Sequence, residues 1–140
     1  MKPKRLELKR DLKETNNALA SLNLELAGQM VLLASQTGDT APLVQAVAAL
    51  RSAEELYSIE SKPRENAEVQ QALADTLLTL GRANQDNEAL RHAVEAYKGA
   101  ITIASLLGDD AMRRDLKRNY GRAKSLLGDQ VKTEALFKVA

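Results

Sequence analysis

The sequence predicts an all-α protein, and more specifically a short right-handed α-solenoid of stacked antiparallel helical hairpins. Three observations support this prediction. Apolar residues recur at spacings of three and four through most of the 140 residues, as one face of a helix requires. The apolar content is mostly Ala, Leu and Val, and aromatic residues make up only 3%, which suits closely packed helices. Finally, the chain matches itself without gaps when it is shifted by about 47 positions.

The internal repeat is clearest between the segments that begin at Ala18 and Glu65. A unit of this length holds two helices of about 20 residues and two connections of about four. Such a hairpin buries its apolar face only by stacking on its neighbours. We therefore divide the chain into residues 1–17, a helix that could be the tail of a preceding repeat, and a repeat domain at 18–140. Its units are about 18–64, 65–109 and an incomplete 110–140. The identical pairs include Ala20–Ala67, Leu26–Leu73, Leu33–Leu80, Leu43–Leu90, Ala46–Ala93 and Ala53–Ala100.

The N-terminal segment allows two interpretations. Residues 3–36 could form one long helix, with a heptad-like seam of Leu12, Leu19, Leu22, Leu26 and Leu33. The repeat register instead favours a break near residues 15–17, because these align with the connection around Ser61-Lys62-Pro63. We expect the break, with residues 3–14 as the end of a preceding helix.

The remaining helix boundaries follow from capping signals. Asp39 or Thr40 can cap a helix that carries Pro42 in its first turn and continues to Tyr57. Ser61 is expected to cap a helix from about Arg64 to Ala83, with Pro63 near its start. Two further helices are expected to start at Asp86-Asn87 and at Asp109-Asp110. Gly108 is expected to end a helix in the left-handed conformation, and Gly128 to end the helix before a short last one.

The second unit resembles the tetratricopeptide (TPR-like) family, in particular its longer-period bacterial members. Leu80-Gly81 followed by Ala93, Tyr97 and Ala100 matches the family's spacing of a Leu-Gly pair and a small–aromatic–small series. The period here is longer than the usual ~34 residues. The resemblance implies that first helices of the hairpins line a concave surface. The matching positions are Gly28, Val31, Ser35, Asp75, Leu78, Arg82, Gln85, Arg122, Ser125 and Asp129.

The resemblance implies a protein–protein interaction scaffold that holds a protein or peptide segment of unknown identity. The Lys and Asn with which some family members clamp a terminal carboxylate are absent from the matching positions. We therefore expect an apolar segment to pack on Val31 and Leu78, with Arg82 and Arg122 selecting acidic groups.

Two other functions remain open. Exposed apolar faces in residues 3–36 or in the last helix could make the chain a homo-oligomerisation module. A basic helix at 111–125 could bind nucleic acid, although no aromatic residues are interleaved for base stacking, so nucleic acid is an unlikely partner. The basic face of that helix consists of Arg114, Lys117, Arg118 and Arg122.

Composition points away from catalysis and cofactors. The chain has no Cys and a single histidine, His92, and its seven glycines form no phosphate loop, so we expect no enzyme activity, no metal and no cofactor. The net charge of +1 provides no global field toward nucleic acid or membrane. We expect no membrane span and no signal peptide, which makes the cytoplasm the default location; an exported mature fragment would have the same sequence.

Overall fold

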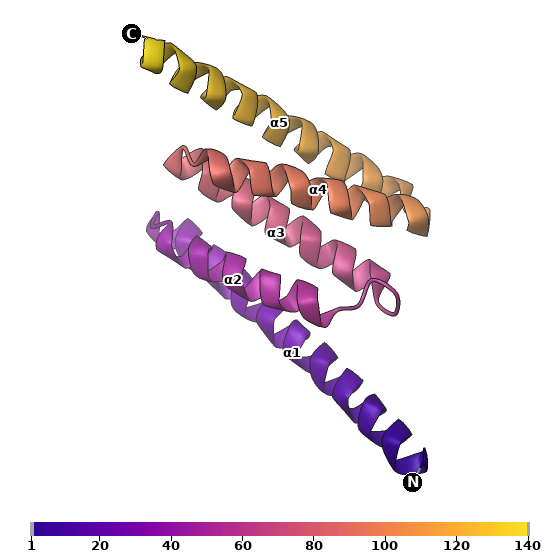
Figure 1. The fold of residues 1–140 in the computed structure, drawn as a ribbon. Helices are drawn as coiled ribbons and strands as arrows, with labels where there is room; N and C mark the ends of the chain where they lie inside the picture. Colours follow the sequence, from indigo (N-terminus) through magenta and orange to yellow (C-terminus); the bar gives the residue numbers. More distant parts are fainter. Residues whose placement is uncertain (1, 140) are drawn as a thin grey trace.

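The computed structural model describes residues 2–139, which are almost entirely helical and contain no strand (Figure 1). This confirms the predicted all-α class. The helices are α1 (Lys2–Thr37), α2 (Ala41–Leu56), α3 (Pro63–Asn84), α4 (Asn87–Leu107) and α5 (Asp110–Val139).

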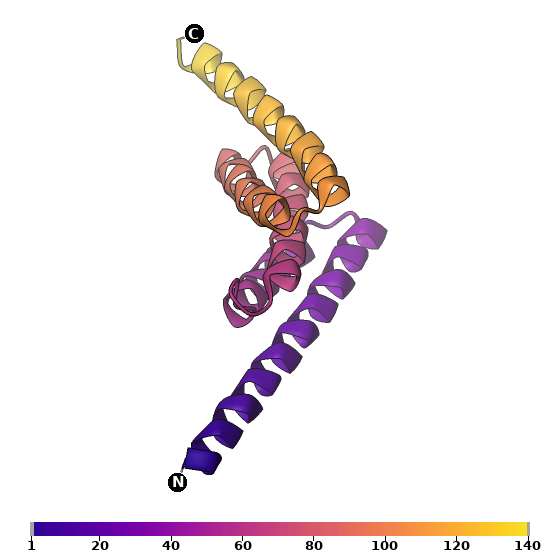
Figure 2. The same cartoon turned by 90° about the vertical axis from the view of Figure 1, so that its right-hand side faces the viewer.

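Each helix packs mainly on the helices next to it in the chain. Extensive contacts join α1 to α2, α2 to α3, α3 to α4 and α4 to α5, whereas α3 and α5 meet only briefly. The helices α1, α3 and α5 run in one direction, and α2 and α4 run in the opposite direction (Figure 1). The N-terminal half of α1 and the C-terminal half of α5 extend beyond the three shorter helices (Figure 2).

Small residues at equivalent repeat positions allow the helices to approach closely. A Cβ atom at Gly81 of α3 would lie 2.6 Å from Cδ2 of Leu90 on α4, so a larger residue does not fit without a shift. On α4, Ala93, Tyr97 and Ala100 are fully buried. The buried small residues of the first helices are Ala20, Ala27 and Ala34 on α1 and, 47 positions later, Ala67, Ala74 and Gly81 on α3.

Most of the predicted caps are present. Asp86 Oδ1 accepts hydrogen bonds from the backbone N–H groups of Glu88 at 3.0 Å and Ala89 at 3.2 Å. Asp109 Oδ1 accepts from the N–H of Met112 at the start of α5, and Asp39 Oδ1 accepts from the N–H of Ala41 at the start of α2. Gly108 ends α4 in the left-handed region with φ of +71°. These caps fix the entry of three helices.

The predicted break near residues 15–17 is wrong, because α1 continues from Lys2 to Thr37. The expectation relied on alignment with the connection around Pro63, but the N-terminal segment has no proline there. Thr15 instead donates its hydroxyl to the carbonyl of Asp11 at 2.8 Å, a bond that fits within a helix. Residues 2–17 are therefore continuous with the helix that opens the first hairpin.

Two further boundary predictions are wrong. Gly128 does not end a helix, since α5 runs through it to Val139; a glycine inside a helix costs about 1 kcal/mol relative to alanine but does not stop the helix. Ser61 is not a cap either: Lys62 precedes α3, and no side chain caps that helix. The connection between α2 and α3 is instead stabilised by hydrogen bonds from a side chain in the first turn of α3.

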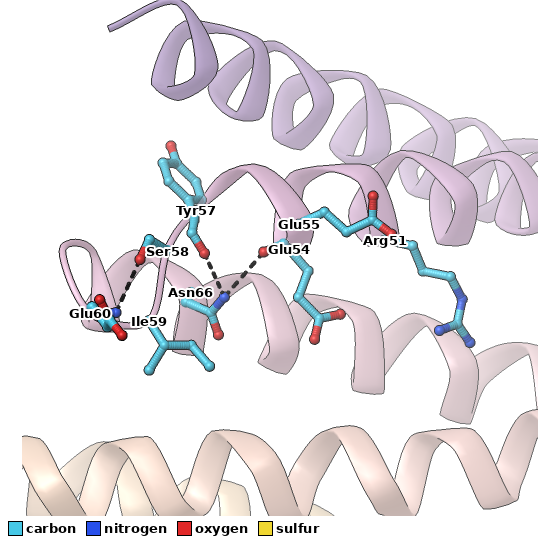
Figure 3. A pocket seen from close by; sticks show the side chains of 8 residues that line it. All are labelled: Arg51, Glu54, Glu55, Tyr57, Ser58, Ile59, Glu60 and Asn66. Atoms are coloured by element: carbon cyan, nitrogen blue, oxygen red, sulfur yellow. Dashed lines mark hydrogen bonds between the residues drawn. The ribbon is translucent and has the colours of Figure 1, made fainter. Parts of the chain in front are cut away.

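A buried polar network performs this role. The amide nitrogen of Asn66 donates to the carbonyls of Tyr57 at 2.8 Å and Glu54 at 3.2 Å, at the end of α2 (Figure 3). Its Oδ1 accepts from Nε2 of Gln70 at 2.7 Å, and Gln70 in turn lies against Gly99 of α4. Asn66 and Gln70 are only 2% and 7% exposed. The network therefore links α2, α3 and α4 in the core.

Candidate binding grooves

One depression lies at the connection between α2 and α3 and has a volume of about 500 Å³. Figure 3 shows that its polar side chains come from the end of α2 and the connection, and that Asn66 turns toward the backbone of α2. Burial raises the pKa of Glu54, and the nearby Arg51 opposes that rise. Because Asn66 is committed to the backbone carbonyls, this depression is a by-product of the connection rather than an assembled site. It is lined by Arg51, Glu54, Glu55, Tyr57, Ser58, Ile59, Glu60 and Asn66.

A second depression lies between α3 and α5. It brings together four of the predicted groove residues, Arg82 from α3 with Arg122, Ser125 and Asp129 from α5, around a volume of about 430 Å³. Gly121 and Leu126 complete its lining. A neighbouring depression of about 240 Å³ shares Asp129 and continues toward the C-terminal end of α5. We call the two together the α3–α5 groove; the second part is lined by Gln85, Asn87, Asp129, Gln130, Thr133, Glu134 and Phe137.

Two polar atoms in this groove have no hydrogen-bond partner among the described residues. They are Oδ1 of Asn87 and Oε1 of Gln130, and both are buried. A buried polar atom without a partner costs about 1–3 kcal/mol. An amide can turn, so that its oxygen and its NH₂ group exchange places. Both oxygens are closed to solvent, so a group in the groove reaches them only if a side chain moves.

Asp75 connects the α3–α5 groove to the core. Its carboxylate accepts a hydrogen bond from the hydroxyl of Tyr97, whose ring is fully buried on α4. Burial raises the pKa of Asp75, and this hydrogen bond lowers it. Burial and Asp75 also raise the pKa of Tyr97 above its ordinary range, while Arg122 and Arg82 act in the opposite direction. Arg82 and Arg122 therefore lie close enough to Tyr97 to act on its hydroxyl electrostatically.

The other predicted groove residues lie elsewhere. Val31 and Ser35 are exposed on α1 and do not line the α3–α5 groove. Leu78 is a buried core residue, 8% exposed, so a partner cannot pack on it as we expected. Its position on α3 turns toward the neighbouring helices rather than toward solvent. Gln85 lines the second part of the groove, as predicted for a concave-surface residue.

Several groove residues were not predicted, namely Asn87, Leu126, Gln130 and Phe137. Three of them lie on α5, where Arg122, Leu126, Gln130 and Glu134 follow at intervals of four residues. That spacing places them on one helix face. The expected helix end at Gly128 concealed the pattern, because it divided α5 into two pieces.

The predicted basic face of α5 is exposed but partly neutralised. Arg118 forms an ion pair with Asp115 at 3.3 Å, and Arg114 donates to the carbonyl of Asp110 at 3.4 Å. Lys117 is exposed on the same face. His92 lies on α4, where Nδ1 is 2.8 Å from Nη2 of Arg51 on α2. Within residues 2–139, no cluster of three or more His, Cys, Asp or Glu side chains could hold a metal ion.

The helix α1 is long and apolar enough to cross a membrane by length and composition alone. Within Lys4–Thr37, an 18-residue window reaches a mean hydropathy of 1.3, and 17% of that window is buried. The sequence-based expectation of no span overlooked this window, because Asn23, Glu25 and Gln29 interrupt its apolar run. An amphipathic helix that packs on protein passes the same test.

No model of a known protein family matches this sequence, and no curated protein or solved structure is significantly similar to it.

Proposed function

We propose that this protein is a protein–protein interaction scaffold, a short TPR-like right-handed solenoid that binds a partner segment in the α3–α5 groove. The observation that carries the proposal is the convergence of Arg82 and Arg122 beside the apolar side chains of Leu126 and Phe137 in one groove. The consecutive packing of antiparallel helices supports the solenoid architecture, as does the 47-residue repetition of buried small residues.

The chemistry of the groove defines the partner. Guanidinium groups bind carboxylates through paired, charge-assisted hydrogen bonds, so an acidic side chain is expected opposite Arg82 and Arg122. Asp129 and Glu134 reverse the sign farther along α5, and they favour a basic or amide group there. Leu126 and Phe137 provide apolar surface between and beyond these charges. A helical or extended segment with one acidic, one apolar and one basic or amide group in that order fits this arrangement.

A peptide-display screen tests the proposal with random sequences in place of a chosen partner. The purified protein is used to select from a library of random 16-residue peptides, and selected peptides are measured by fluorescence anisotropy. We expect acidic and apolar residues to be enriched together. The double variant Arg82→Glu/Arg122→Glu should weaken binding by about 10–100-fold, since each lost charged hydrogen bond contributes about 1.5–3 kcal/mol and the effects need not add.

The matched control is Arg114→Glu/Arg118→Glu, which makes the same charge change on α5 outside the groove. Binding by this control should remain within about threefold of the unaltered protein, with far-UV circular dichroism confirming that both variants fold. If the selected peptides bind the groove variant and the control equally well, the groove is not the binding site. If no peptide is enriched, the scaffold proposal loses its support.

A further inference from the structure

A stripe of exposed leucines runs along α1. Its members are 42–67% exposed, although leucine side chains are strongly favoured inside proteins. Leu12, Leu19, Leu26 and Leu33 are seven residues apart, and Leu8 and Leu22 each lie four residues before one of these. This is the a/d spacing of a coiled-coil seam. We call this set the leucine stripe: Leu8, Leu12, Leu19, Leu22, Leu26 and Leu33.

The repeat register shows what this face does elsewhere in the molecule. The residues of α3 that lie 47 positions after Leu19, Leu22, Leu26 and Leu33 are Asn66, Val69, Leu73 and Leu80, and all four are buried. Asn66 is hydrogen-bonded to the end of α2, and Leu80 forms a cluster with Ala34 and Leu43 of the first two helices. On α3, this face is therefore the one that stacks on the preceding hairpin.

The same face is buried on α5. Leu116, which lies 47 positions after Val69, is fully buried in the cluster that includes α4. The leucine stripe thus occupies a stacking face on α1 that no helix covers within the described residues. Its leucines therefore occupy the positions that make contacts between hairpins elsewhere in the repeat.

We propose that the leucine stripe binds the same stripe of a second copy of this chain, so that two α1 helices form a two-stranded coiled coil. The length of the stripe sets the size of this contact. Leu8 to Leu33 spans about 39 Å of α1, and a contact strip about 10–12 Å wide over that length would bury roughly 800–900 Å² over both copies. An area of this size is typical of a weak, reversible dimer.

The charges beside the stripe favour a protein helix over a lipid surface. A helix that lies on a membrane usually carries Lys and Arg on its polar face. Here carboxylates are interspersed with the basic residues near the start of the stripe, since Glu7, Asp11 and Glu14 lie among five Lys and Arg residues at positions 4–13. Between positions 15 and 37, Glu25 is the one charged residue. Mixed charges beside an apolar seam are typical of coiled coils, where they pair across the interface. The N-terminal half of α1 also extends away from the other helices, which leaves room for a second helix (Figure 2).

Analytical ultracentrifugation of the full chain between 1 and 100 µM tests the proposal. We expect a dimer with twice the 15.3 kDa monomer mass. The variant Leu19→Glu/Leu22→Glu places two carboxylates per copy in the apolar seam, and it should raise the dimer dissociation constant about a hundredfold or more. The control Leu6→Glu/Leu106→Glu makes the same chemical change at exposed leucines outside the stripe, 67% and 81% exposed, and should remain dimeric.

A cross-linking experiment covers the case in which the glutamate variant fails to fold. The chain has no cysteine, so Leu22→Cys introduces a single thiol on the stripe and Leu6→Cys a single thiol off it. With a short cross-linker that carries two thiol-reactive groups, the Leu22→Cys chain should form covalent dimers much faster than the Leu6→Cys chain. Equal rates would contradict the proposal.

Other outcomes also decide the matter. A wild-type chain that stays monomeric at 100 µM overturns the proposal. If that monomer sediments with vesicles of phosphatidylcholine and phosphatidylglycerol, the stripe binds a lipid surface instead. A dimer that persists in Leu19→Glu/Leu22→Glu shows that another surface forms it. The groove variant Arg82→Glu/Arg122→Glu should leave the dimer intact, so failure of this proposal and failure of the proposed function are distinguishable.

Discussion

The close approach of α3 and α4 can be measured by comparing Gly81→Ala with Gly121→Ala. Both glycines lie inside long helices, so alanine improves the intrinsic helix propensity by about 0.8–1.0 kcal/mol at each position. Their surroundings differ. A Cβ at Gly81 would lie 2.6 Å from Cδ2 of Leu90 and 3.1 Å from the backbone oxygen of Asp86, whereas a Cβ at Gly121 would meet nothing within 4 Å.

The magnitudes follow from these contacts. Gly121→Ala should stabilise the protein by about 1 kcal/mol, because only the helix propensity changes. At Gly81 the same gain is opposed by overpacking, which costs about 1–3 kcal/mol in a well-packed core. Leu90 is fully buried and the oxygen of Asp86 belongs to the backbone, so neither can move aside easily. The propensity term cancels in the comparison, and the two variants should differ by about 1–3 kcal/mol.

Thermal unfolding followed by circular dichroism is the assay. For a chain of this size the expected difference corresponds to roughly 4–12 °C between the two melting temperatures, with Gly121→Ala the higher. Gly81→Ala should cost less in a Leu90→Ala background than in the unaltered protein, because the shorter side chain leaves room for the new methyl group. Leu90→Ala itself lowers stability by about 2–5 kcal/mol, so the comparison is made within that background. If Gly81→Ala is as stable as Gly121→Ala, the two helices are not as close as the structure places them, and the packing role of the Leu-Gly pair is refuted.

Three further predictions concern polar contacts. Asn66→Ala should lower the free energy of unfolding by about 2–4 kcal/mol in urea denaturation, because it removes three hydrogen bonds and leaves a buried carbonyl without a donor. Tyr97→Phe should destabilise the protein by about 1–3 kcal/mol at pH 7 and less at pH 3, because the lost hydroxyl stabilises ionised Asp75. Arg64→Gln should flatten the loss of stability in acid titration below about pH 4, since Arg64 lowers the pKa of Asp109 through a 2.8 Å ion pair.

The two folded-state pKa shifts are opposite, but both variants lose most stability at the higher pH, where the carboxylate is ionised. The pKa of Asp75 is already raised by burial, and removing the Tyr97 hydroxyl raises it further, so the extra cost in Tyr97→Phe grows as pH rises and Asp75 ionises. The pKa of Asp109 is lowered in the folded state, so its contribution is present above the unfolded pKa and is lost as pH falls.

Each of these predictions has a control or a contradicting outcome. Asn84→Ala removes an exposed asparagine from the same helix as Asn66 and should change stability by less than about 0.5 kcal/mol. An Asn66 variant no weaker than this control would show that the network is not needed. A pH-independent effect of Tyr97→Phe would separate Asp75 from Tyr97. An unchanged acid titration in Arg64→Gln would mean that solvent screens the Arg64–Asp109 pair completely.

The helix ends that were predicted correctly depend on local chemistry. Asp86 and Asp109 cap the N–H groups two or three residues ahead of them, and Gly108 adopts a left-handed conformation that other residues disfavour. These interactions lie within one turn of the chain, so the sequence contains all of their partners. The incorrect predictions have two causes. The break at residues 15–17 was inferred by alignment with another repeat. Ser61 and Gly128 were assigned from residue type alone, without a capping hydrogen bond or a chain reversal to stop the helix there.

The candidate groove was only partly predictable. Arg82, Arg122 and Ser125 were expected on one surface because the repeat register equates their positions, and the structure places them together. The register did not reveal that Leu78 is buried, since burial depends on how far the neighbouring helices reach across α3. Phe137 joined the groove only because α5 continues past Gly128.

The sequence by itself determined the helical class, the small residues at the contacts between helices and most of the capped ends, because periodicity, propensity and capping act over a few residues. Only the tertiary structure decided the continuity of α1 and α5, the use of Asn66 to hold the connection between α2 and α3, and the exposure of the leucine stripe. Those features depend on which helix lies against which face. That relation joins residues far apart in the chain, and the same apolar spacing is buried on α3 and uncovered on α1.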